Sequence, residues 1–353
     1  MTLKRLIFSA ISLSLIALGL CAWWGYHALH SAQAHDAADE FISIPRGTPP
    51  TEIINRLARR GVIADELPVL AYLRLTGAGA RLKAGEYKFP SPVSPFDVLR
   101  RLTEGQQRLN RFTVIEGWTR WDIATALQRL PELKLKDQDD ALKLLTETSL
   151  IKDIDPVAKD LEGYLYPDTY SFPPETTSTK MVETMVRRFR DVWQRHADAR
   201  KLQGLSAREI VTIASLIETE AKLADERPLV ASVIYNRLER RMTLGIDSSV
   251  IYASKLAGKW RNDGKVYQSD LDRESPYNTR RIAALPPGPI ASPSESSLKA
   301  ALEPAKTNYL FYVRDPQRND GAHNFYADEA DFSRGVQSLR EWERTRDASS
   351  NAR

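Results

Sequence analysis

The chain has 353 residues, of which 42% are hydrophobic and 27% are charged, and its formal net charge is +4. This composition excludes an intrinsically disordered chain, and the length exceeds that of one ordinary domain. The single cysteine, Cys21, excludes a disulfide framework and a cysteine zinc site within the chain. Basic and acidic residues alternate and form no basic stripe with interleaved aromatic residues, so we expect no nucleic-acid partner.

The N-terminus carries an uncharged apolar run. Lys4 and Arg5 precede residues 6–26, and about 20 apolar residues span a bilayer core as a helix. No further Lys or Arg occurs before Arg46, so residues 1–5 are expected in the cytoplasm and the remainder outside. The alternative is a cleaved signal peptide that ends near residues 32–34, and either interpretation exports the rest of the chain.

A small module is predicted after the apolar run. Residues 27–41 are polar and indicate a linker, and residues 42–107 read as a compact α/β unit. We predict strands at 41–44 and 84–89, and helices at 48–60, 67–75 and 95–102.

A larger mixed α+β domain is predicted for residues 111–345, followed by a polar tail at 346–353. Residues 161–172 indicate an ordered loop or short strands, and residues 244–296 show little helical periodicity. The expected strands are 112–115 and 308–313, and the expected helical segments are 119–130, 135–160, 181–197, 206–223, 226–241, 297–301 and 327–344.

The most informative helix is residues 206–221. Ser206 and Glu209 fit a capping box, which marks its start. At about 100° per residue its apolar side chains form one stripe, with Glu218 and Glu220 near opposite borders. A carboxyl beside an apolar face loses hydration and keeps a proton more readily, as a general acid must. Helix geometry alone still favours two solvated rim residues.

Residues 214–221, ASLIETEA, resemble the central motif of the MltG/YceG-like endolytic murein transglycosylases. The resemblance continues through nearly the whole chain. Arg281, Asn324 and Ala327 depart from the family pattern, which leaves local substrate contacts open. The other similar segments are LEGYLYPDTYSF at 161–172, residues 226–253, residues 275–302, and the closing residues 311–325.

The resemblance implies that Glu218 is the catalytic acid/base of a bacterial lytic transglycosylase. Such an enzyme cleaves the MurNAc–GlcNAc bond, with the sugar's own C6 hydroxyl as nucleophile, and leaves 1,6-anhydroMurNAc ends. One carboxyl suffices for this reaction, so Glu220 is expected to be structural. No histidine spacing or glycine-rich fingerprint points to a metal or another cofactor.

Further residues are expected to contact substrate, each with a structural alternative. Glu162, Asp168 and Asp247 could orient sugar hydroxyls, although Asp247 could equally be a turn residue. Tyr166 and Tyr252 could stack on pyranose rings or fill the core. Tyr277 and Asn278, in a proline-rich loop, complete the candidate substrate-binding set.

The resemblance also implies a location and partners. We expect an inner-membrane protein with a periplasmic catalytic domain that acts on nascent glycan strands and ends their elongation. Residues 42–107 resemble a LysM module, and glycan binding and bracing both remain open for it. Peptidoglycan synthases are candidate partners. The alternative function is a noncatalytic, membrane-anchored scaffold that binds peptidoglycan.

Overall fold

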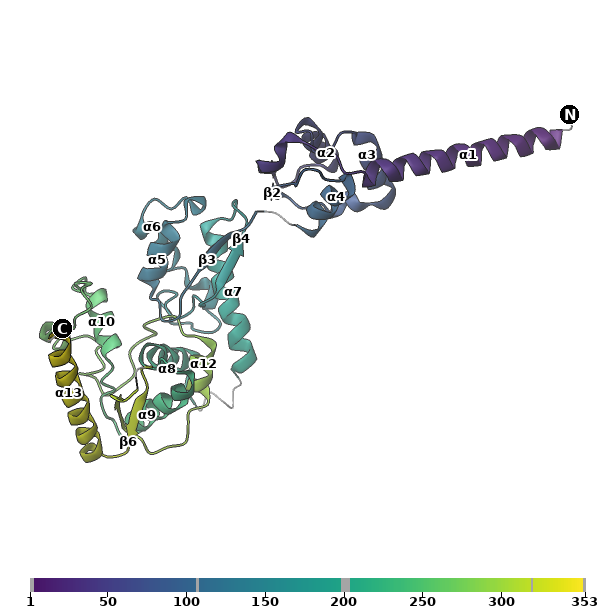
Figure 1. Cartoon of the computed structure of the whole chain (residues 1–353). Coiled ribbons are helices and arrows are strands. Elements are labelled where there is room, and N and C mark those ends of the chain that lie inside the picture. Colours follow the sequence, from purple (N-terminus) through teal and green to yellow (C-terminus); the bar gives the residue numbers. More distant parts are fainter. Residues whose placement is uncertain (1–2, 106–107, 198–203, 319, 352–353) are drawn as a thin grey trace. The chain divides into compact units, whose positions relative to one another are not determined.

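The computed structural model describes residues 3–105, 108–197, 204–318 and 320–351. The fold is mixed α+β, and the chain divides into two compact units. The first unit comprises residues 1–111 with 171–176, and the second comprises residues 112–170 with 177–353. Figure 1 labels most of the elements along the chain.

The first unit begins with one long apolar helix, α1 (Leu3–His30). Its apolar side chains are widely exposed, with Phe8 at 74% and Leu18 at 71%. Among the described residues, Ile11–His30 forms the one helix long and apolar enough to cross a membrane. This helix fits a single-pass anchor and runs four residues beyond the expected end of the span, at residue 26.

The rest of the first unit packs three helices against a small sheet. Ile42 of β1 pairs with Tyr87 of β2 in an antiparallel register. Ile54 and Leu57 are fully buried because their spacing places both on the core-facing side of their helix. The elements are η1 (Asp36–Asp39), β1 (Ile42–Ile44), α2 (Pro50–Arg59), α3 (Glu66–Thr76), η2 (Ala78–Arg81), β2 (Gly85–Tyr87) and α4 (Pro95–Glu104).

The segment expected to be a linker, residues 27–41, is instead built into this unit. Leu29 and Ala37 belong to its hydrophobic core. His30 stacks on Phe96 of α4 with ring centroids 4.8 Å apart, and Gln33 forms an isolated β-bridge with Val93. The polar composition of residues 27–41 suggested a linker, but the two apolar side chains of Leu29 and Ala37 are enough to attach this short segment to the core. The order β1–α2–α3–β2 agrees with the predicted order, while the likeness to LysM stays a prediction.

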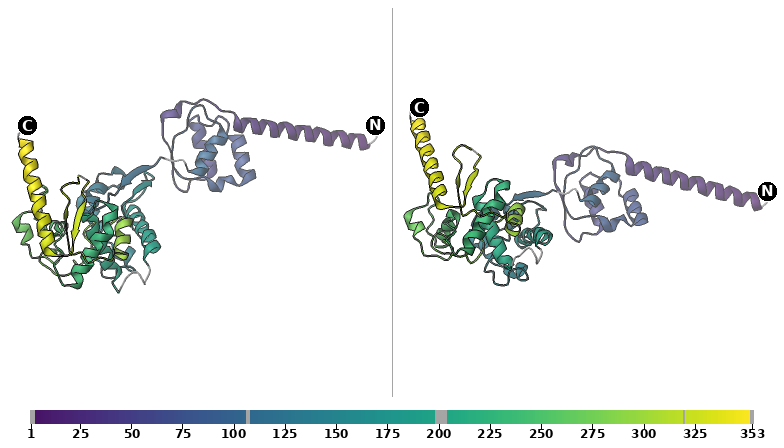
Figure 2. Two further views of the ribbon diagram at one scale, coloured as in Figure 1. Left: turned by 60° about the horizontal axis from the view of Figure 1, so that its bottom comes forward. Right: turned by 90° about the horizontal axis from the view of Figure 1, so that it is seen from below.

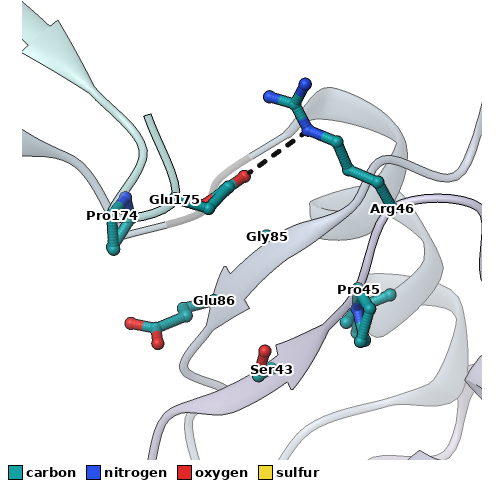
Figure 3. Close-up of a pocket in the computed structure, with 8 residues that line it drawn as sticks. Ser43, Pro45, Arg46, Gly85, Glu86, Pro174 and Glu175 are labelled. Atoms are coloured by element: carbon teal, nitrogen blue, oxygen red, sulfur yellow. Dashed lines mark ion pairs between the residues drawn. The ribbon is translucent and has the colours of Figure 1, made fainter. Parts of the chain in front are cut away.

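A pocket of about 550 Å³ lies beside the β1–β2 sheet in the first unit (Figure 3). Arg46 reaches toward Glu175, 4.0 Å away, across its rim. Both side chains are well exposed, so this ion pair contributes little to stability. The lining residues are Ser43, Ile44, Pro45, Arg46, Gly85, Glu86, Pro174 and Glu175, and none is aromatic.

The second unit is built around α8 (Ala207–Glu220), which is buried from Ile210 to Ile217. The Ser206–Glu209 capping box starts this helix, as the sequence predicts. α8 contacts α9 (Arg227–Glu239), α10 (Asp247–Leu256) and α12 (Glu295–Leu302). Figure 1 and the views in Figure 2 show α8, α9 and α12 side by side. A helix that is apolar on nearly all sides needs such an enclosure.

The remaining elements surround this helical core. β3 and β4 form one two-stranded sheet, and β5 and β6 form another, in which Phe311 pairs antiparallel with Tyr326. Their bounds are β3 (Asn110–Thr113), α5 (Arg120–Gln128), η3 (Pro131–Leu133), α6 (Gln138–Leu144), η4 (Thr148–Ile151), β4 (Thr169–Phe172), α7 (Ser178–His196), η5 (Ala224–Glu226), α11 (Gln268–Leu271), β5 (Phe311–Arg314), β6 (His323–Tyr326) and α13 (Glu329–Asn351).

Two helical predictions differ from the structure. Residues 244–296 contain α10 and α11, although little helix was expected there. Buried serines conceal the apolar period of α10, because Ser249 donates to the Ile246 carbonyl and Ser254 to Asp270. Residues 135–160, expected to be helical, form only α6 and the short turn η4. The polar tail expected from residue 346 continues the backbone of α13 to Asn351.

The buried position of Leu29 yields the first prediction. Leu29→Ala removes core contacts and should lower the free energy of unfolding of the first unit by about 2–3 kcal/mol. Leu67→Ala is the matched control, because Leu67 is 71% exposed and should change that value by less than about 0.5 kcal/mol. Denaturant unfolding of the detergent-solubilised chain measures both. Equal stability of the two variants would show that residues 27–41 are a tether after all.

Candidate active site

Glu218, in the last turn of α8, lies in a buried ion pair. Its side chain is 4% exposed, and Arg227 donates from Nη2 to Glu218 Oε1 at 3.0 Å. The backbone N–H of Ser294 donates to Glu218 Oε2 at 2.7 Å. Each carboxylate oxygen therefore has one donor, and both donors suit an ionised carboxylate. About four acceptor positions exist on a carboxylate, so these two donors do not use its full hydrogen-bonding capacity.

Arg227 is held as firmly as the carboxylate that it binds. It begins α9, its side chain is 9% exposed, and Nη1 donates to Ser294 Oγ at 2.7 Å and also contacts Ser296 Oγ. One guanidinium thus joins the end of α8 to the start of α12. Sequence reasoning missed Arg227 and Ser294, since an arginine beside a proline at a helix start looks like an ordinary surface residue.

The loop at residues 287–294 runs alongside α8 from the start of this helix to Glu218. Arg208 Nε donates to the Pro287 carbonyl, the Ile290 N–H donates to Ser215 Oγ, and the Ser294 N–H reaches Glu218. A second segment approaches the same end. Gly117, at a φ of +77°, donates its N–H to the Ser292 carbonyl, and a Cβ there would lie 4.0 Å from Glu218 Cγ. These segments enclose the carboxyl.

Glu162 is a second buried carboxyl in the same unit. Both of its oxygens accept from the Arg120 N–H at 3.1 Å, and the Tyr252 hydroxyl donates to Oε2 at 3.2 Å. The side chain borders a cavity of about 320 Å³. Burial raises the pKa of Glu162 to about 8, so this carboxyl is mostly protonated at neutral pH.

Two segments that resemble the family, residues 161–172 and the loop at 275–290, form much of the wall of this cavity. Residues 161–172 contribute Glu162 and Tyr164 to the cavity, and residues 275–290 contribute Tyr277 and Pro287. Glu218 is not among its lining residues. Of the predicted substrate-binding residues, the cavity brings together Glu162, Tyr252 and Tyr277; the two tyrosine rings lie 5.0 Å apart.

The structure places the other predicted site residues elsewhere in the second unit. Asn278 is fully buried, and its amide donates to the carbonyls of Leu271 and Arg273, which favours a bracing role. Tyr166 is 6% exposed beneath the Arg188 guanidinium. Asp168 pairs with Arg188 at 2.8 Å. Asp247 pairs with Arg280 at 2.6 Å, and their side chains are 55% and 43% exposed.

Glu220 lies two residues from Glu218 in a different environment. Tyr312 donates its hydroxyl to Glu220 Oε2 at 2.8 Å, and burial raises the pKa of Glu220. Nearby, His323 contacts Glu226 through Nδ1 at 2.8 Å. The contact with Tyr312 supports the structural role expected for Glu220. Among the described residues, no group of three or more His, Cys, Asp and Glu side chains is arranged to hold a metal ion.

Comparison with known proteins gives a consistent result. Residues 42–338 match the YceG-like family. The chain is 33% identical over 313 residues to an endolytic murein transglycosylase of Bacillus subtilis, an alignment covering 84% of this chain and 85% of that protein. It is 27% identical to a protein of the same name from Streptococcus pneumoniae, covering 92% of this chain and 63% of that protein.

A solved structure agrees with the sequence relatives. The crystal structure of a YceG-like protein from Listeria monocytogenes aligns with a TM-score of 0.56 and 29% sequence identity. The alignment covers 83% of this chain and 98% of the Listeria chain.

Loss of the buried ion pair should destabilise the second unit. Arg227→Ala leaves the Glu218 carboxylate buried without its cation, which should lower the free energy of unfolding by about 3–5 kcal/mol. Lys180→Ala is the control, because Lys180 pairs with Glu183 at the surface and should change stability by less than about 1 kcal/mol. Denaturant unfolding measures both, and equal effects would contradict a structural role for the pair.

Glu162 should make stability depend on pH. Its pKa is raised in the folded chain, so the folded state binds the proton more tightly than the unfolded state. Between pH values of about 5 and 8 its contribution to stability therefore falls as pH rises, by at most about 1.4 kcal/mol per unit. Glu162→Gln should flatten the stability profile in this range. Unfolding curves collected across the range would refute this if wild type and variant remain parallel.

Proposed function

The chain belongs to the YceG-like family, and from that premise we propose that it is an endolytic lytic transglycosylase that cleaves the glycan strands of peptidoglycan. The observation that carries the proposal is the carboxyl of Glu218, which two donors hold in one orientation within the segment that resembles the family motif. Two relatives named endolytic murein transglycosylase support the substrate and reaction class.

The proposed reaction uses Glu218 twice. Pairing with Arg227 favours the carboxylate, so the reaction starts once Glu218 has taken up a proton. The protonated carboxyl then donates to the glycosidic oxygen as the bond from MurNAc C1 to that oxygen breaks. The resulting carboxylate then takes the proton of the MurNAc C6 hydroxyl as O6 bonds to C1. Water is neither added nor released, and the product carries a 1,6-anhydroMurNAc end. A second catalytic carboxyl, which ordinary glycosidases require, is unnecessary because the nucleophile belongs to the sugar.

Arg227 has two roles in this scheme. Its positive charge stabilises the carboxylate that forms once the leaving oxygen has taken the proton. Its contacts with Ser294 and Ser296 also fix the direction of the carboxyl. Because the Glu218 side chain is 4% exposed, glycan binding requires local movement.

The finer location and partners are part of the same proposal. α1 would anchor the chain in the bacterial inner membrane, with its N-terminus cytoplasmic and the catalytic unit periplasmic. Lys4 and Arg5 precede the span and no Lys or Arg follows it until Arg46, a local charge asymmetry that supports this orientation. There the enzyme would cut nascent strands beside the synthases and so end their elongation. The first unit would either bind glycan, as LysM modules do, or brace the catalytic unit.

Substitution of three glutamates tests the assignment. Glu218→Gln should lower kcat by about 10²–10⁴, the usual contribution of acid–base catalysis. Glu220→Gln and Glu162→Gln should largely retain kcat. The measurement is mass spectrometry of glycan ends after incubation of the full chain with uncrosslinked strands.

Three outcomes would contradict the proposal. Full activity of Glu218→Gln would remove that residue from catalysis, and reducing MurNAc ends would indicate a hydrolase. Wild-type protein that binds sacculi but releases no fragments would support the noncatalytic scaffold. Loss of activity in Glu162→Gln alone would transfer the acid role to the protonated carboxyl of the cavity.

A further inference from the structure

The cavity beside Glu162 has the features of a binding site within the second unit. Its volume is about 320 Å³, and its walls come from four separate parts of the chain and from the start of α8. Three tyrosines line it. The lining residues are Arg120, Lys159, Asp160, Glu162, Tyr164, Arg208, Tyr252, Leu256, Pro276, Tyr277, Pro287, Gly288 and Pro289.

The charges around the cavity favour an anion. Arg120 pairs with Asp160 at 2.5 Å, and Arg208 pairs with the buried Asp155 at 2.7 Å, so these charges cancel. Lys159 has no ion-pair partner in the part of the chain that the structure describes. Glu162 is mostly neutral at pH 7, because burial raises its pKa to about 8. A net positive charge therefore remains on the cavity wall.

Two guanidinium groups, those of Arg120 and Arg208, also line the cavity. Gly288 makes room for one of them, since a Cβ at that position would lie 2.7 Å from Arg208 Nη2. Arg120 Nε is buried and has no hydrogen-bond partner among the described residues. Planar guanidinium groups bind carboxylates well, with two parallel N–H donors.

The distance from this cavity to Glu218 is set by α8. Arg208 and Glu218 are ten residues apart on that helix, which is about 15 Å at a rise of 1.5 Å per residue. A second path limits the nearer wall of the cavity. Gly117 lies beside Glu218, and Arg120 lines the cavity only three residues later, at most about 11 Å along the chain, so the cavity wall extends from this nearer point to Arg208 at about 15 Å.

That separation matches the reach of a peptide stem. In peptidoglycan, a short peptide with free carboxylates is attached to the lactyl group of MurNAc. A stem of about four residues spans roughly 14 Å when extended. The lactyl carboxylate of a strand without stems would stay beside the sugar and could not reach so far.

We propose that this cavity binds a free carboxylate of the peptide stem carried by the MurNAc residue at Glu218, with Lys159 as the uncompensated cation and the paired guanidinium groups of Arg120 and Arg208 as neighbouring N–H donors. The inference rests on the proposed function. It makes the stem part of substrate recognition, so the enzyme would prefer strands that still carry peptides over stripped strands.

The test compares two substrates with the full-length protein. One is uncrosslinked glycan with its stems, and the other is the same glycan stripped of stems by an amidase. Lys159→Ala should raise KM about fivefold to tenfold on the stem-bearing glycan, leave kcat unchanged, and have no effect on the stripped glycan. Lys152→Ala, an exposed lysine outside the lining set, is the matched control and should change neither value.

A binding measurement separates failure of this inference from failure of the proposed function. A synthetic stem tetrapeptide should bind the full chain, and Lys159→Glu should abolish binding, even if neither glycan is cleaved. Binding should also weaken above about pH 8, as Glu162 ionises. Equal KM changes on both glycans, or tetrapeptide binding unaffected by Lys159→Glu, would overturn the inference.

Discussion

The ion pair between Glu218 and Arg227 is the contact on which the arrangement of the second unit depends. Both side chains are almost fully buried, so each charge needs the other. Because Arg227 also binds two serines at the start of α12, the same guanidinium joins α8, α9 and α12. The carboxyl that we propose as catalytic is thus part of the structural framework, and its orientation is fixed by the packing of three helices.

The two buried carboxyls of the unit illustrate how environment sets chemical form. Glu218 faces a cation and a backbone donor. Within the described part of the chain, the Glu162 oxygens accept from the Arg120 backbone N–H and the Tyr252 hydroxyl and contact no cationic group. Burial therefore dominates and raises the pKa of Glu162, so it retains a proton at neutral pH. In the functions that we propose, Glu218 transfers a proton, whereas Glu162 serves as a neutral polar group on the wall of the cavity.

Much of the fold could be predicted from the sequence, because caps and apolar periods are local signals. The Ser206 capping box and the apolar N-terminal helix are examples. The surroundings of Glu218 could not be predicted, because its two hydrogen-bond donors, Arg227 and Ser294, lie outside α8. Likewise α10 was missed because its buried serines look polar in a sequence. The full burial of Asn278 also depends on loop packing, which no local pattern reveals.

The apolar helix α1 continues directly into the packed part of the first unit. α1 runs to His30, whose ring stacks on Phe96, and Leu29 lies in the core of that unit. With α1 as the membrane anchor that we propose, this direct junction sets the distance between the first unit and the lipid headgroups by the length of α1 outside the bilayer. On this basis the protein would sample a thin layer of the wall next to the membrane, where new strands emerge.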